Sequence, residues 1–453
     1  MILDLTAYEK AFAALPENVT AAEVCADGHE ELLIRVSGGK QTGSENFSKT
    51  TLYLRASGEK TGTVLTERLD DDPYRLMELA LDCASYSQAE APELMNDADN
   101  CHIVTGDDSC NAGDILNAAI NLEAQAAALP GVSSVTGCFV RKTTLARRVL
   151  NSKGLDRFLE HTGYLASISL RASRNGASGP AGSAEAYVDS LTNLNCKALA
   201  MKALATADLS DGGGTLAPAA VPSGKYAAVL SNQVTRNIMI TAWMSFVRER
   251  MESGNSAFPL TSGQMMASEK VSLVDDPCPP SWSVDYRLDS EGTLCQKTDI
   301  LRNGQLVTPL STLASGVSSG NAGRIAGLSG TTPINLITIP SCIYIESGDS
   351  TVEEMLQQMG DGIYLTYSLD VFHSINIASG EFSIPCGGIL YKDGKPVGTA
   401  DQLTIAGNLR DLFRDVLAVG DDLTLEEFMF YHNYSYGGPS LLVKELSFSS
   451  KQE

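Results

Sequence analysis

The five residues 316–320, Gly-Val-Ser-Ser-Gly, match the G-x-S-x-G pattern of serine hydrolases and place Ser318 in the nucleophile position. In those enzymes the serine sits on a strained turn between a buried strand and a helix. Here both flanks are small and polar, and no helical pattern follows. The sequence therefore favours a flexible loop, and a hydrolase that uses Ser318 is kept as the less favoured alternative.

A polar cluster between residues 97 and 110 contains residue types that bind metal ions. As a calcium loop it fails, because His102 stands where the loop requires glycine. As a zinc site it lacks paired spacing of its cysteine and histidine residues. We expect a surface loop, formed by Asp97, Asp99, Asn100, Cys101, His102, Asp107, Asp108 and Cys110.

The segment 231–277 is the most informative stretch of the chain. It opens with about five turns of helical pattern, and Gly254 supplies a residue suited to the left-handed conformation that ends a helix. A polar loop and a short strand, SEKVSLVDD, follow. We expect a long, mostly buried helix whose apolar face is marked by Ile238, Trp243, Phe246 and Val247.

The same segment resembles a known family. SAF at 256–258 and ASEKVSLVDDP at 267–277 are similar to the TldD/PmbA peptide-maturation metalloproteases, whose older name is "modulator of DNA gyrase". In the proteolytic member this helix carries His-Glu-x-x-x-His, with the histidines on zinc and the glutamate as base. Aligned without gaps, those positions are Met239, Ile240 and Met244 here. The resemblance implies the PmbA type of subunit, also called TldE, which lacks the metal site.

The chemistry of these side chains agrees with that implication. Zinc requires imidazole, carboxylate or thiolate ligands, whereas Met239 and Met244 offer neutral thioethers, which suit monovalent copper at best. We expect both methionines to fill core volume beside Trp243. The family's third ligand is a cysteine before the last strand, but residues 420–440 contain none, and His432 is the only possible ligand nearby. No metal or other cofactor is therefore expected.

Composition excludes several classes of protein. The 453 residues carry a formal charge of −22 and no basic stripe, which argues against nucleic-acid binding. The first residues, MILDLTAYEKAF, lack the pattern of a signal peptide, and no apolar run is long enough to predict a membrane span. Ten cysteines without close pairs favour reduced thiols. We expect a cytoplasmic protein.

Periodicity predicts an α+β fold with several domains, since the chain is long for one core. An N-terminal α+β domain is expected at 1–86 and a middle α+β domain at 87–209. A Gly-Pro-rich linker follows at 210–224. A C-terminal β-rich domain, a barrel or sandwich around the helix at 231–252, fills 225–453. Helices are predicted at 5–15, 73–83, 114–129, 183–205, 231–252, 351–359 and 409–419, and an Asn-Ser-Lys-Gly hairpin turn at 151–154.

Three further phrases carry the resemblance: SGDSTVEEMLQQMGDGIYL, GEFSIPCGGILYKDGKPV and GNLRDLFRDVLAVGDDL. In addition, residues 319–324 resemble a family phrase, TGN-x-x-R, in a loop close to the active cleft. The resemblance implies that Asn321 and Arg324 shape a peptide cleft or a subunit contact.

The resemblance implies a non-catalytic subunit of a two-subunit metallopeptidase. Its expected partners are a zinc-bearing TldD-like subunit and a peptide substrate, and a homodimer is also plausible. The alternatives are a binding protein without proteolysis, as the gyrase name suggests, and the hydrolase that would use Ser318.

Overall fold

The computed structural model of the chain describes residues 3–86, 94, 100–210, 212–261, 263–316, 318–324, 336–428 and 434–450. The N-terminal half is built on one seven-stranded sheet of order β3-β2-β1-β5-β6-β4, with β7 also paired to β6. All pairs are antiparallel except β4 with β6. The strands are β1 Ala21–Ser37, β2 Lys40–Ser57, β3 Thr61–Thr66, β4 Cys101–Thr105, β5 Val132–Asn151, β6 Asp156–Arg174 and β7 Ala177–Val188.

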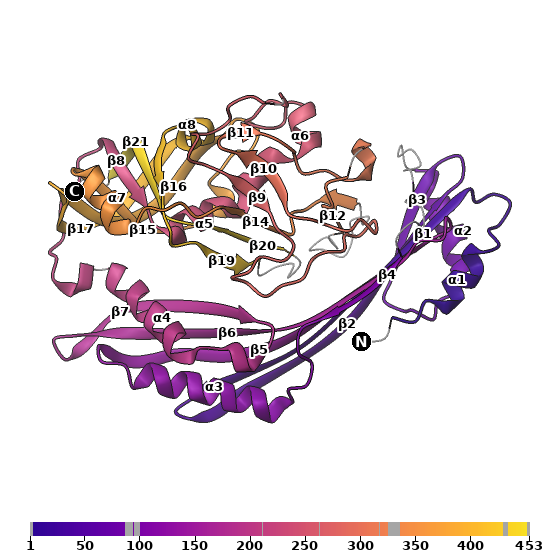
Figure 1. Ribbon diagram of the computed structural model, residues 1–453, viewed down its shortest axis with the longest axis horizontal. Helices are drawn as coiled ribbons and strands as arrows, with labels where there is room; N and C mark the ends of the chain where they lie inside the picture. The colour runs from indigo at the N-terminus through magenta and orange to yellow at the C-terminus, as the bar shows by residue number, and fades with distance from the viewer. Residues whose placement is uncertain are drawn as a thin grey trace.

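Four helices cover one side and one end of this sheet (Figure 1). Two of them pack beneath β5 and β6 and bury an alanine-rich core, and the other two close the far end over β1 and β2. They are α1 Thr6–Phe12, α2 Pro73–Ala84, α3 Ala112–Ala127 and α4 Cys196–Ser210. Helix α2 starts at the predicted residue, Pro73, and the Asp72 side chain caps it by accepting the Tyr74 amide.

The C-terminal half contains two six-stranded sheets and lies over the other face of the N-terminal sheet (Figure 1). The first has the order β17-β16-β15-β8-β21-β18, and an additional β17–β21 pairing closes five of its strands into a barrel. Its strands are β8 Gly224–Leu230, β15 Gly362–Ser368, β16 Glu381–Lys392, β17 Lys395–Asn408, β18 Val416–Val419 and β21 Leu441–Ser450.

The second sheet has the order β11-β10-β9-β14-β20-β19, and β12 and β13 form a separate hairpin. Between the two large sheets lies α5, Asn232–Ala242, within one core. The remaining elements are α6 Arg248–Glu252, α7 Val352–Met359, α8 Leu409–Arg414, β9 Leu273–Asp275, β10 Thr298–Arg302, β11 Gln305–Leu306, β12 Ala322–Arg324, β13 Leu336–Thr338, β14 Cys342–Ile345, β19 Thr424–Glu427 and β20 Ser435–Gly438. The predicted fold class, α+β with a C-terminal β-rich barrel around a central helix, is confirmed.

The expected division at residue 86 does not divide the sheet, because β1 and β5, from opposite sides of that boundary, pair over most of their lengths. The predicted domain boundaries at residues 86 and 209 and the predicted linker at 210–224 remain proposals about how the chain divides into domains. The predicted hairpin turn at 151–154 joins β5 to β6. There Gly154 has φ +92°, which favours glycine.

Three predicted helices are wrong in part. The helix expected at 231–252 continues past α5 as a 3-10 turn at Trp243–Phe246 and breaks at Val247, which is extended. It breaks there because Phe246 and Arg248 exchange backbone hydrogen bonds with Leu310. The helix expected at 183–205 begins only at 196. Its first residues belong to β7, whose Gly182 lies against α4. The helix expected at 409–419 ends at 414, and the β-branched residues after it form β18.

Candidate functional site

The three residues that the sequence aligns with the family's zinc motif, Met239, Ile240 and Met244, lie in or beside α5, and none of them has an imidazole, carboxylate or thiolate group. The Ser231 side chain accepts a hydrogen bond from the Val234 amide (3.3 Å) and starts the helix. Met239 is fully buried in the core between the sheets. Ile240 and Met244 are partly buried and pack against the same core. The predicted role of both methionines as core residues beside Trp243 is therefore what the packing shows.

Aromatic rings surround this part of α5. Trp243 meets Tyr434 edge-on at 5.7 Å between centroids and donates its indole N–H to the Ile240 carbonyl. Phe428 stacks on Tyr434 at 4.8 Å and on Phe372 at 5.9 Å. Within the described ranges, no three His, Cys, Asp or Glu side chains gather closely enough to hold a metal ion. His432 lies outside those ranges.

The loop that matches the hydrolase pattern has a different structure from a nucleophile elbow. Ser318 accepts a hydrogen bond from the Gly320 amide (3.1 Å) and contacts the Thr293 hydroxyl (3.3 Å). The next element is strand β12, whereas the hydrolase pattern needs a helix that starts at the serine. Among the residues that the structure describes, the hydrogen bonds of Ser318 involve no basic side chain and no helix starts at it, so the geometry does not favour the hydrolase alternative.

The polar cluster at 97–110 forms local structure. Cys101–Thr105 is strand β4, which corrects the expectation of an irregular loop there, and His102 packs on Phe158 at 4.4 Å. Asp107 accepts hydrogen bonds from Ser109, and Asp108 pairs with Lys142 at 2.7 Å. Asp97 and Asp99 lie outside the described residues. The described members therefore form strand β4 and hydrogen bonds or ion pairs with neighbouring side chains.

Asn321 ties the β12 loop to strand β9. Its side-chain amide donates to Asp275 (2.6 Å), which also accepts the Ser341 amide (2.8 Å). Burial raises the pKa of Asp275 to about 6, although these hydrogen bonds favour its charged form. Arg324 ends β12, opposite Leu336 of β13. Both residues singled out from the sequence thus lie on one small hairpin.

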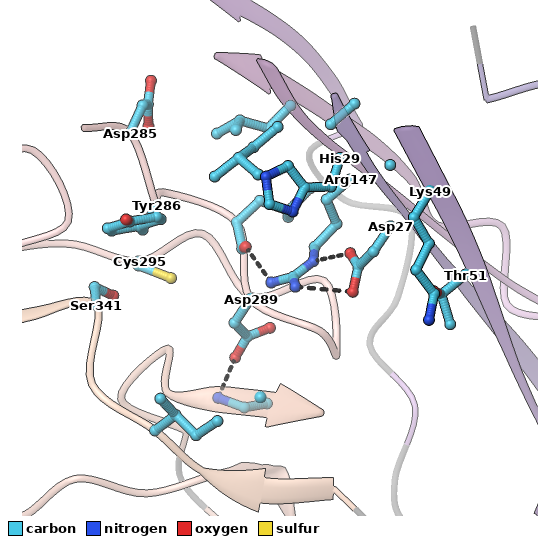
Figure 2. A pocket seen from close by; sticks show the side chains of 18 of the residues that line it. Asp27, His29, Lys49, Thr51, Arg147, Asp285, Tyr286, Asp289, Cys295 and Ser341 are labelled. Atoms are coloured by element: carbon cyan, nitrogen blue, oxygen red, sulfur yellow. Dashed lines mark hydrogen bonds and ion pairs between the residues drawn. The ribbon is translucent and has the colours of Figure 1, made fainter. Parts of the chain in front are cut away.

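Asn321 also lines a cavity of about 610 Å³ between the two halves of the chain. One wall is the inner face of the N-terminal sheet, and the other consists of loops of the C-terminal half (Figure 2). The sheet contributes side chains of β1, β2 and β5, with Asp27, His29, Glu45, Phe47, Lys49 and Arg147 among them. The opposite loops contribute Asp285, Leu288, Asp289, Cys295, Ile339 and Ser341.

An ion pair and a buried carboxylate lie at the centre of this cavity. Arg147 binds both carboxylate oxygens of Asp27 (2.6 and 3.1 Å) and donates to the Leu288 carbonyl (3.1 Å), as Figure 2 shows. Asp289 accepts three backbone N–H groups, including that of Ala322. Burial nevertheless raises the pKa of Asp289 to about 6.

More arginines of the sheet bind the C-terminal half beside the cavity. Buried Arg55 pairs with Glu23 at 3.0 Å and with Glu291 at 3.5 Å. Arg157 donates to the Gly292 carbonyl at 2.6 Å. Burial raises the pKa of Glu291 to about 7, although the Arg55 charge opposes that shift. The segment 285–292 is therefore bound to the sheet through charged side chains.

A family model decides the membership of the chain. Residues 223–450, half of the chain, match the model of the PmbA/TldA metallopeptidase C-terminal domain. The chain belongs to the PmbA/TldD family. The resemblance carried by the SAF and VDDP phrases is thereby confirmed.

Curated relatives of the family align over limited stretches. The metalloprotease PmbA homolog of Haemophilus influenzae is 33% identical over 138 residues, which cover 30% of this chain and 28% of that protein. A metalloprotease of Methanothermobacter thermautotrophicus is 24% identical over 209 residues, or 45% and 44%. The chain thus spans less than half the length of these two relatives.

Solved structures of the family share the whole fold. A protein described as a modulator of a DNA gyrase, from Thermotoga maritima, has a TM-score of 0.80 at 22% identity, covering 98% of this chain and 99% of that one. TldE from Thermococcus kodakarensis has a TM-score of 0.80 at 18% identity, covering 98% and 100%. At these identities the likeness shows the fold alone.

Sequence reasoning found only Asn321 of the cavity's lining. The remaining walls come from strands far apart in the chain, so no local motif marks them. The one available signal is in β2, where the small polar residues Asn46, Ser48 and Thr50 alternate with the larger or charged residues that face the cavity. Within the described ranges, no helix is long and apolar enough to cross a membrane.

Proposed function

We propose that this protein is the non-catalytic subunit of a two-subunit metallopeptidase that acts on peptides. One observation carries the proposal: Met239, which the sequence aligns with a zinc ligand of the family, is fully buried in the core. A thioether packed on all sides cannot ligate zinc or activate water. The chain would then contribute to catalysis through the shape of the peptide cleft and through its contact surface with the partner subunit.

The proposed partner is a zinc-bearing TldD-like subunit, which would supply the metal, its bound water and the glutamate base. Asn321 and Arg324 would shape the cleft or the contact with that partner. The hydrogen bond from Asn321 to buried Asp275 gives this hairpin a fixed position against β9. We also propose that the chain forms a homodimer in the absence of the partner. We propose a cytoplasmic location for it as well.

Co-expression with a zinc-bearing family member from the same organism tests the proposal. We expect a stable complex that cleaves unfolded peptides and contains zinc, whereas the isolated chain contains background zinc and does not cleave. The matched control is a partner with both histidines of its His-Glu-x-x-x-His motif replaced by alanine, which should assemble without activity. Tightly bound stoichiometric zinc in the isolated chain, or cleavage by it alone, would refute the proposal.

A further inference from the structure

The first half of β2 is an edge of the N-terminal sheet. Strand β3 pairs with β2 only from Leu52 to Ser57. From Lys40 to Thr51, no described strand pairs with β2 on the side away from β1. Side chains on both faces of residues 40–50 are exposed or half-buried. An edge of this kind presents unpaired N–H and C=O groups to a strand of another molecule.

The sequence of this edge is complementary to itself. In an antiparallel pair of two copies around a two-fold axis, each contact occurs twice, and opposite residues point to the same face. With the axis at Phe47, the two Phe47 rings oppose each other, and Glu45 of each copy opposes Lys49 of the other. The other face pairs small polar residues, Ser44 with Thr50 and Asn46 with Ser48. Aromatic pairs and unlike charges directly opposite each other stabilise paired strands.

Within the free stretch, only this register opposes unlike charges. An axis through Glu45 opposes two glutamates, and an axis through Lys49 opposes two lysines. Axes through Asn46 or Ser48 place Phe47 opposite a charged residue. A lysine on an edge strand normally discourages pairing with other chains. Here each lysine meets a glutamate, so the charges select one register.

The length of the free edge fits the same register. Residues 43–51 are centred on Phe47, which is 45% exposed, and β3 begins to pair directly after them, at Leu52. In the single chain Glu45 pairs with Arg35 at 2.9 Å and Lys49 with Glu67 at 2.7 Å, and all four side chains are largely exposed. Exposed ion pairs contribute little, so Glu45 and Lys49 can exchange partners at small cost.

We propose that β2 of one copy pairs antiparallel with β2 of a second copy around Phe47, which joins the two N-terminal sheets edge to edge. The inference rests on the homodimer of the proposed function and names its contact surface. Glu45, Phe47 and Lys49 also line the interdomain cavity. The cavities of the two copies therefore lie on the same face of the joined sheet and adjoin at the two-fold axis.

Sedimentation velocity of the full chain and of charge-reversed variants tests the contact. Glu45→Lys opposes two pairs of lysines, and Lys49→Glu opposes two pairs of glutamates, so each should raise the dissociation constant of the dimer about tenfold or more. The double variant restores both unlike pairs and should dimerise like the native chain. An equimolar mixture of the two single variants should form a mixed dimer for the same reason.

Controls separate the contact from net charge and from folding. Glu78→Lys on α2 and Lys197→Glu on α4 change the net charge equally at exposed positions and should leave the dissociation constant unchanged. All substituted side chains are exposed, and recovery in the double variant and in the mixture requires folded chains.

Engineered cysteines test the register. In a chain that also carries Cys83→Ser and Cys278→Ser at its exposed thiols, Phe47→Cys should cross-link the dimer under mild oxidation. Ser48→Cys should not, because residue 48 opposes residue 46 of the second copy. Equal cross-linking of both, or a dimer insensitive to the charge reversals, would overturn the proposed contact while the homodimer stands. A monomeric native chain would overturn both, whereas peptide cleavage with the zinc-bearing partner would still support the two-subunit peptidase.

Discussion

Glu291 offers a stability test of the contact between the two halves of the chain. The residue is fully buried, lies 3.5 Å from Arg55, and accepts the backbone N–H of Leu313 at 2.8 Å. Burial raises its pKa to about 7 from the ordinary 4.5. The substitution Glu291→Gln keeps the shape and an oxygen for the Leu313 amide, and it removes the ionisation.

The expected magnitude follows from the two pKa values. Because the folded-state pKa is the higher one, the folded chain retains between about pH 4.5 and 7 a proton that the unfolded chain has released. The free energy of unfolding therefore falls as pH rises through this window. With about 1.4 kcal/mol for each pKa unit, Glu291 should cost about 2 kcal/mol of stability between pH 5 and pH 7.5. The glutamine variant should lack this pH-dependent loss, so its free energy of unfolding should change less between pH 5 and pH 7.5 than that of the native chain.

Urea denaturation followed by tryptophan emission measures the effect. Of the two tryptophans, Trp243 lies in the core of the C-terminal half and Trp282 packs on Tyr187 of the N-terminal sheet at 5.5 Å. Their summed emission therefore reports both unfolding of that core and separation of the two halves. Exposed Glu269, replaced by glutamine, serves as the control and should leave the pH profile of the native chain unchanged. Parallel pH profiles for the native chain and Glu291→Gln would show that burial of Glu291 does not control this window.

Three further outcomes are expected. Met239→Ala should lower the free energy of unfolding by about 2–5 kcal/mol, as for large-to-small changes in a core, measured by urea denaturation; a loss below 1 kcal/mol would contradict tight packing of α5. Gly106→Ala should strongly lower the midpoint of thermal unfolding, because φ is +80° and the new Cβ would lie 1.8 Å from the Thr162 carbonyl oxygen. An unchanged midpoint in calorimetry would contradict this geometry. Ser318→Ala should leave peptidase activity of the complex unchanged, whereas loss of activity with normal assembly would revive the hydrolase alternative.

The sequence predicted the elements that its local patterns encode. The helices predicted at 73–83 and 351–359 are present, and in the structure Asp72 and Thr351 cap their first turns. The helix break at Val247 was not predictable, because it depends on backbone hydrogen bonds to Leu310, more than sixty residues away. Strand β7 was missed because its alanines hide the period of two, and its close approach to α4 depends on Gly182.

The candidate site was predictable only where a family phrase marks it. The phrase at 319–324 indicated Asn321, which lines the cavity, but nothing local connects it with Asp27 or Arg147. Those residues reach the same space because the long antiparallel strands β1 and β5 carry them there in register, with Asp27 opposite Arg147. Hydrophobic periodicity likewise cannot predict the parallel pairing of β14 with β20. The residues that form the walls of the cavity could therefore be identified only from the three-dimensional structure.

The width of the cavity is set by buried charges. Arg141 of β5 bridges Glu31 of the sheet and Glu427 of β19, and Arg55 and Arg147 bind the segment around Asp289 from the same sheet. A buried ion pair adds little net stability against an apolar substitute, but removal of one partner leaves an uncompensated charge and costs about 3–5 kcal/mol. These contacts therefore resist both opening and collapse of the space between the halves. A site held open in this way loses little binding energy to its own ordering, which favours tight binding of a ligand that fits the preformed space.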